Sequence, residues 1–122
     1  MNVMIVDDKA KVRTMIRGLL EGGLSGVEHI YECADGHEAV IAYENHHPDW
    51  VLMDIEMEPM DGLTASRIVL TADPLAKVII VTSYGDARYR EAAHAAGVHA
   101  YVLKENLRDI LGIITKSSSA PA

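Results

Sequence analysis

Residues 50–62 read WVLMDIEMEPMDG, and the short apolar run that opens this stretch ends at the carboxylate of Asp54. Four consecutive apolar residues followed by turn-forming residues are typical of a strand buried on both faces, as in a parallel sheet covered by helices. Asp54 would then lie at the carboxyl end of the strand, where open α/β sheets bind their ligands. Many aspartates in such positions only start a turn, so a functional role needs support from the rest of the chain.

Three other apolar runs also end directly at polar residues. These residues are Asp7 and Asp8 after residues 3–6, Thr82 and Ser83 after residues 78–81, and Lys104 after residues 100–103. A further run, residues 27–33, mixes polar and apolar positions in the way that edge strands do. The sequence therefore predicts five strands, four of which carry polar side chains to their carboxyl ends.

Helical periodicity fills the segments between these strands. It predicts helices over residues 9–21, from Asp35-Gly36 to before Pro48, from about Leu63 to before Pro74, over 86–96 and over 105–115. Gly22 and Gly23 are expected to end the first helix in a left-handed cap. Alternating strands and helices predict an α/β fold, a doubly wound five-stranded parallel sheet with helices on both faces.

If the strand order is 2-1-3-4-5, the first and third strands are neighbours, and Asp7, Asp8 and Asp54 surround one crevice. Three carboxylates so close would raise each other's pKa unless a cation shared them. Ligands that are all oxygen atoms favour Mg²⁺, which keeps coordination positions open for phosphate oxygens. Lys104 and Thr82, on adjacent strands, would add a positive charge and a hydroxyl donor, so the pattern indicates phosphoryl chemistry.

This pattern resembles the receiver domain of two-component response regulators. The similarity covers residues 1–115 and rests on Asp7-Asp8, Asp54-x-x-Met57-x-x-Met60-Asp61-Gly62, Val81-Thr82-Ser83, Ala96-Gly97 and Ala100-Tyr101-Val102-Leu103-Lys104. It implies the flavodoxin-like receiver fold, with the order 2-1-3-4-5, and a phosphorylation-dependent signalling switch that is not an enzyme. Asp54 would accept a phosphoryl group from a phosphohistidine on a sensor histidine kinase.

The resemblance also implies a metal site. Asp8 and Asp54 would coordinate Mg²⁺ directly, Asp7 would do so directly or through water, and Glu56 would contribute its main-chain carbonyl.

A switch is implied by the same resemblance. Thr82 and Lys104 would hold phosphoryl oxygens and assist the domain's own phosphotransfer and dephosphorylation, and Tyr101 would be the aromatic switch. Phosphorylation would then alter the surface made of helix 86–96, strand 100–103 and helix 105–115. A homodimer could form through this surface.

Two positions depart from the family pattern. The family commonly has proline four residues after the acceptor, whereas this chain has Glu58 there and Pro59 next. Glu105 replaces the proline that commonly follows the lysine in a cis bond. Because a cis bond before a residue other than proline costs about 3 to 4 kcal/mol, we expect a trans bond before Glu105.

Composition limits the partners and the compartment. Eighteen acidic and eleven basic residues give a net charge of −7, which opposes direct contact with nucleic acid or an anionic membrane. The single cysteine, Cys33, fits a reducing compartment, and no apolar run reaches membrane-spanning length, so we expect a cytoplasmic protein.

Residues 116–122 are expected to form a flexible tail or the start of a linker. Residues 104–107 resemble receivers that carry a helix-turn-helix DNA-binding output domain, which is absent from this chain.

Three other classes of protein share parts of this pattern. A phosphatase of the haloacid dehalogenase type also uses an aspartate nucleophile, but on the first strand. A flavodoxin-like redox carrier needs a phosphate-binding loop where this chain has Asp7 and Asp8. A receiver-like binding module that acts without phosphorylation stays open as an alternative. Asp61 is expected only to start a helix, and the adjacent pair His46-His47 is not expected to bind zinc.

Overall fold

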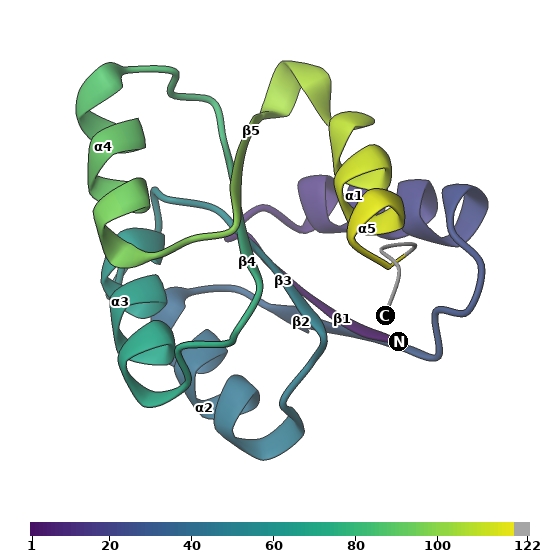
Figure 1. Ribbon diagram of the computed structural model, residues 1–122, viewed down its shortest axis with the longest axis horizontal. Helices are drawn as coiled ribbons and strands as arrows, with labels where there is room; N and C mark the ends of the chain where they lie inside the picture. Colours follow the sequence, from purple (N-terminus) through teal and green to yellow (C-terminus); the bar gives the residue numbers. More distant parts are fainter. Residues whose placement is uncertain (119–122) are drawn as a thin grey trace.

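The computed structural model describes residues 1–118, which form a five-stranded parallel sheet with helices on both faces (Figure 1). The elements in chain order are β1 (Asn2–Val6), α1 (Ala10–Gly23), β2 (His29–Cys33), α2 (Gly36–His46), β3 (Trp50–Met53), α3 (Gly62–Ala72), β4 (Val78–Thr82), α4 (Ala87–Ala96), β5 (Ala100–Leu103), the 3₁₀ turn η1 (Lys104–Asn106) and α5 (Asp109–Ser118). The strand order is β2-β1-β3-β4-β5. The predicted fold class and strand order are therefore confirmed.

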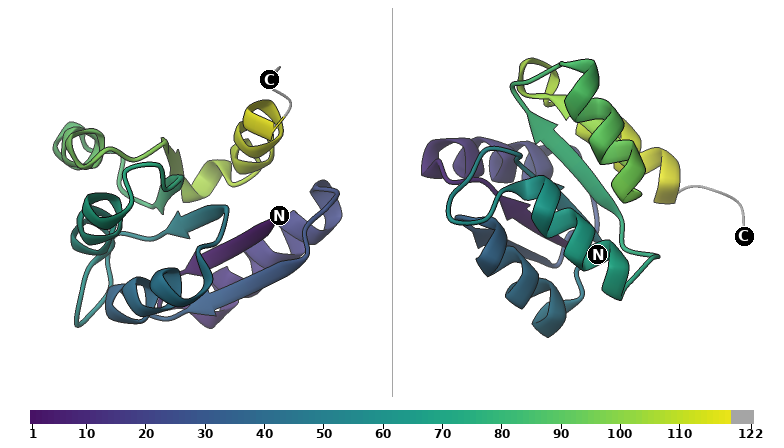
Figure 2. Two further views of the ribbon diagram at one scale, coloured as in Figure 1. Left: turned by 60° about the horizontal axis from the view of Figure 1, so that its bottom comes forward. Right: turned by 90° about the vertical axis from the view of Figure 1, so that its left-hand side faces the viewer.

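Two apolar cores lie on opposite faces of the sheet. The right-hand view of Figure 2 looks onto α2, α3 and α4, which lie side by side in front of the sheet, with α1 and α5 behind it. Successive residues of a strand point to opposite faces. In β1, Met4 and Val6 join the core beneath α2, α3 and α4, whereas Val3 and Ile5 join the core beneath α1 and α5. The two covered faces explain why the central strands are apolar at every position.

The start of α3 packs directly against the main chain that follows β3. The amide of Gly62 donates a hydrogen bond of 2.8 Å to the carbonyl of Ile55. A Cβ atom at Gly62 would lie 1.7 Å from the carbonyl oxygen of Asp54, so no larger residue fits without a backbone shift. Asp61 caps the helix, because its carboxylate accepts a hydrogen bond of 2.8 Å from the amide of Thr64. The structural role expected for Asp61 is confirmed.

The expected cap of the first helix is wrong. α1 continues through Gly23 and ends at Leu24 in an extended conformation. A Cβ atom at Gly23 would lie 2.5 Å from Leu111 Cδ1, so this glycine provides space for α5 rather than a left-handed turn. The left-handed glycines of the described chain are Gly26 and Gly97, and Gly97 ends α4 as predicted.

The end of the chain also differs from the prediction. The last helix begins at Asp109 and not at residue 105, because residues 104–106 first form the turn η1. Residues 116–118, expected to belong to a tail, continue α5 as helix, and the rest of that expected tail lies outside the described residues. The peptide bond before Glu105 is trans as expected, and the bond between Glu58 and Pro59 is cis.

We predict that Gly62→Ala will lower the free energy of unfolding by about 3 kcal/mol, because the added methyl group would overlap the carbonyl of Asp54. Urea denaturation measures this change. Gly18→Ala is the matched control, since a Cβ atom at Gly18 meets nothing within 4 Å and alanine favours helix formation. Equal stabilities of the two variants would contradict the proposed close approach.

Candidate functional site

The pairing of β1 with β3 brings two aspartates to neighbouring positions. Val6 and Met53 are partners in the parallel register, and each is the last residue of its strand. The amide of Asp54 donates a hydrogen bond of 2.9 Å to the carbonyl of Val6. Asp7 and Asp54 are therefore neighbours directly after the paired ends of β1 and β3.

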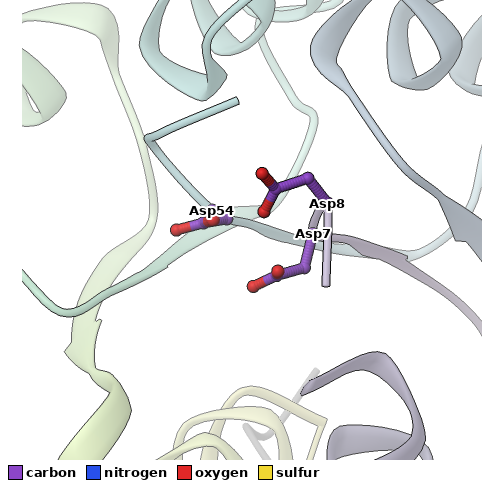
Figure 3. Close-up of side chains that lie close together, drawn as sticks. All are labelled: Asp7, Asp8 and Asp54. Carbon is purple, nitrogen blue, oxygen red and sulfur yellow. The ribbon is translucent and has the colours of Figure 1, made fainter. Parts of the chain in front are cut away.

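Asp8, the next residue, completes a cluster of three carboxylates. Figure 3 shows Asp7 and Asp8 on the turn after β1 and Asp54 at the end of β3. One oxygen of each side chain lies within 4.8 Å of the others. Asp7 and Asp54 are buried, whereas Asp8 is exposed. The three carboxylates therefore lie together as predicted, with one of them open to solvent.

Lys104 places its ammonium group beside the two buried aspartates. Its Nζ atom lies 2.8 Å from Asp7 Oδ2 and 3.4 Å from Asp54 Oδ1. The other oxygen of Asp7 accepts a hydrogen bond of 2.8 Å from the amide of Lys9. Both carboxylate oxygens of Asp7 thus have protein partners, and one lysine charge offsets only part of the negative charge of the cluster.

Within residues 1–118, one carboxylate oxygen of Asp54 has no hydrogen-bond partner. Oδ1 accepts a hydrogen bond of 2.9 Å from the amide of Ile55, whereas the buried Oδ2 has no partner among these described residues. Burial and the charge of Asp7 raise the pKa of Asp54 to about 6, although Lys104 opposes this shift. A buried, unpaired carboxylate oxygen beside two further carboxylates is a donor set that fits a hard divalent cation such as Mg²⁺.

Tyr84, in the loop after β4, connects three of the residues singled out in the sequence. Its amide donates to the buried Thr82 Oγ1 at 3.2 Å, and its hydroxyl donates to Glu56 Oε2 at 2.7 Å. The hydroxyl of Tyr101, on β5, donates to the carbonyl of Tyr84. Sequence reasoning missed Tyr84, because an aromatic residue two positions after a strand carries no distinctive signal.

A hollow of about 670 Å³ opens beside the carboxylate cluster. Asp8 lines it from the turn after β1, and Glu56, Asp61 and Arg67 line it from the loop after β3 and from α3. Tyr89 of α4 closes another side. Asp8 therefore faces both the cluster and an open space.

The other features considered in the sequence do not form a second site. His46 stacks on the ring of Tyr31 with 4.2 Å between ring centroids. Within residues 1–118, the aspartate cluster is the only group of three or more side chains placed to share a metal ion. None of the helices in that range is both long and apolar enough to span a membrane.

Comparisons with known proteins find relatives over nearly the whole chain. The family model described as "Response regulator receiver domain" matches residues 3–115. The chemotaxis protein CheY of Bacillus subtilis is 35% identical over 116 residues, which cover 94% of this chain and 95% of that protein. The response regulator protein VraR of Staphylococcus aureus is 36% identical over 95% of this chain, which spans only 56% of VraR.

Solved structures show the same fold. The crystal structure of the CheX-CheY-BeF3-Mg complex from Borrelia burgdorferi matches with a TM-score of 0.89 and 28% identity, covering 98% of this chain and 90% of that one. A LuxR-family DNA-binding response regulator from Staphylococcus aureus matches with a TM-score of 0.87 and 30% identity, covering 94% and 96% of the two chains. This chain therefore belongs to the response regulator receiver domains, the phosphorylation-dependent switches of two-component signalling.

Proposed function

We propose that Asp54 is the residue that becomes phosphorylated and that a sensor histidine kinase supplies the phosphoryl group. The observation that carries this proposal is the unpaired, buried Oδ2 of Asp54 at the carboxyl end of β3. Lys104 and the carboxylates of Asp7 and Asp8 lie around it. An isolated carboxylate oxygen in such a place is a suitable nucleophile for a phosphoryl group.

The transfer forms one bond and breaks one. Asp54 Oδ2 attacks the phosphorus of the phosphohistidine, the P–N bond breaks, and the imidazole of the kinase leaves with the electron pair. Lys104 Nζ, which already contacts Asp54 Oδ1 at 3.4 Å, would turn to a phosphoryl oxygen. The hydroxyl of Thr82 accepts a bond from the amide of Tyr84 and can still donate its proton to another phosphoryl oxygen.

The chain would hold Mg²⁺ through Asp8 and Asp54 directly, through Asp7, and through the main-chain carbonyl of Glu56. When bound, Mg²⁺ would supply the positive charge that lets an ionised Asp54 and an incoming phosphoryl group share one crevice. Because both carboxylate oxygens of Asp7 have protein partners, we assign Asp7 two roles: it would contact Mg²⁺ through a water molecule, and it would orient Lys104.

The domain would therefore act as a phosphoacceptor that assists its own phosphotransfer and dephosphorylation. The receiver unit would extend from residue 1 through residue 115, with the final turn of α5 leading toward any following segment.

The partners would be the sensor histidine kinase, a second copy of the domain through α4, β5 and α5, and a DNA-binding output domain. Two response-regulator relatives support the last assignment, since this chain spans 56% of VraR and the other is named as DNA-binding.

We predict that a small acyl phosphate with Mg²⁺ will add one phosphoryl group to the wild-type protein and none to Asp54→Asn, as measured by intact-protein mass spectrometry. Hydroxylamine should remove the label, because it cleaves acyl phosphates. Asp61→Asn is the matched control, since asparagine caps a helix as well as aspartate does and labelling should persist. Equal labelling of wild type and Asp54→Asn would exclude Asp54 as the acceptor.

Without metal, Asp54→Asn should stabilise the domain. A carboxyl whose pKa is raised by folding destabilises the native state above that pKa. This penalty disappears as the pH falls to the pKa that the carboxyl has in the unfolded chain. With the pKa of Asp54 raised from 3.8 to about 6, we expect a gain of about 3 kcal/mol at pH 8 that declines between pH 6 and pH 4. Urea denaturation in the presence of a chelator tests this expectation, and a gain that did not change with pH would contradict it.

We also predict that Thr82→Ala will uncouple Tyr101 from phosphorylation. In the wild type, movement of the Thr82 hydroxyl to the phosphoryl group should displace Tyr84 and change the contact of the Tyr101 hydroxyl with the Tyr84 carbonyl. NMR of the Tyr101 ring and sedimentation with and without acyl phosphate measure the change and any dimerisation. Ser83→Ala, an exposed neighbour, should respond as the wild type does. A wild-type response in phosphorylated Thr82→Ala would contradict the coupling.

A further inference from the structure

The turn that carries Asp7 and Asp8 is held at its main chain as well as at its side chains. The amide of Asp7 donates to the carbonyl of Cys33 on β2 at 3.1 Å. The carbonyl of Asp7 accepts a hydrogen bond of 2.6 Å from the guanidinium of Arg13, one turn into α1. This last contact involves a side chain that the proposed phosphoryl chemistry does not use.

The contact with Arg13 fixes the peptide group that precedes Asp8. A peptide group is planar, so the carbonyl of Asp7 and the amide of Asp8 rotate together. Because Asp8 is exposed and, among the described residues, its carboxylate pairs only with the Lys9 ammonium, at 3.3 Å, its side chain is weakly held. The direction in which Asp8 leaves the main chain therefore depends on the orientation of this peptide group.

Arg13 is itself fixed by an ion-pair network that reaches the edge of the sheet. Its Nε lies 3.0 Å from Glu32 Oε1 on β2, and Arg17 binds the other oxygen of Glu32 at 2.9 Å. Arg17 also donates to the carbonyl of Ile30 at 3.2 Å. Burial opposes ionisation of Glu32, but the two arginines outweigh it and lower the pKa of this carboxyl, which stays ionised at neutral pH.

We propose that Arg13 is a positioning residue for the metal site: held by Glu32, it orients the Asp7–Asp8 peptide group so that the carboxylate of Asp8 faces Asp54. This inference rests on the proposed binding of Mg²⁺ by the aspartate cluster. Arg13 does not touch the metal or the phosphoryl group, and it acts through the main chain of Asp7. Groups that orient metal ligands in this way commonly change metal affinity 10- to 100-fold.

Arg17 provides a matched control on the same helix. Arg13 and Arg17 both pair with Glu32, but only Arg13 reaches the carbonyl of Asp7. Arg17→Met removes the same charge, the pairing of Arg17 with Glu32 and its bond to the carbonyl of Ile30, while leaving the Arg13–Asp7 hydrogen bond in place. A general loss of charge or of α1–β2 packing would affect both variants alike.

The experiment compares wild type, Arg13→Met and Arg17→Met by two measurements. Titration with Mg²⁺ alone should show affinity about tenfold weaker in Arg13→Met and within about twofold of wild type in Arg17→Met. In the metal-free proteins, NMR should show a shifted amide ¹⁵N resonance of Asp8 and faster hydrogen exchange of the Lys9 amide in Arg13→Met only. The Lys9 amide reports on the turn because it donates to Asp7 Oδ1.

The outcomes separate this inference from the proposed function. Wild-type Mg²⁺ affinity in a folded Arg13→Met, or equal weakening in both variants, would overturn the positioning role. If the wild type bound no Mg²⁺, the proposed metal site would fail, and the metal-free NMR comparison would still test whether Arg13 orients the turn. Should Arg13→Met not fold, Arg13→Gln replaces it with the same expected results, because glutamine is too short to reach both Glu32 and Asp7.

Discussion

The parallel pairing of β1 with β3 is the constraint on which the rest of the structure depends. The register that joins Val6 to Met53 ends both strands at the same level, and the hydrogen bond from the amide of Asp54 to Val6 continues that pairing by one residue. Two carboxylates are thereby fixed next to each other at the centre of the sheet. Helices on both faces bury the strands, so Asp7 and Asp54 cannot both turn toward solvent.

This arrangement is electrostatically unfavourable on its own. Burial and the charge of Asp7 raise the pKa of Asp54 to about 6, and Lys104 compensates only in part. The domain thus gives up stability to keep an ionisable, unpaired oxygen at the end of β3. Strain of this kind is common at functional sites, where a ligand or modification supplies the missing partner.

The sequence pattern was sufficient to predict an α/β fold with a parallel sheet, because each central strand is apolar on both faces and is followed by a helix, whereas the strand order came from the resemblance to receiver domains. Once that strand order was assumed, the cluster of Asp7, Asp8 and Asp54 followed, since residues after neighbouring parallel strands meet at one edge. Helix ends were less predictable: Gly23 reads as a cap, but its role depends on Leu111, which is distant in sequence. Tyr84 and Arg13 were missed for a different reason, because each makes a hydrogen bond that involves a main-chain carbonyl, and a carbonyl leaves no signal in the sequence.

The close packing of Gly62 against Asp54 limits how the backbone can move when a charged group is added to the Asp54 side chain. The main chain of Asp54 is confined on both sides, by its hydrogen bond to Val6 and by the first turn of α3 against its carbonyl oxygen. A new group on Asp54 therefore cannot be relieved by backbone movement of β3 or α3. The loop of residues 83–86 is exposed, and a Cβ atom at Gly85 would lie no closer than 3.6 Å to its nearest neighbour, so this loop, which leads into α4, has more room to move than the backbone at Gly62. One glycine contact thus leaves the backbone at the carboxyl end of β3 less room for movement than the loop that leads into α4.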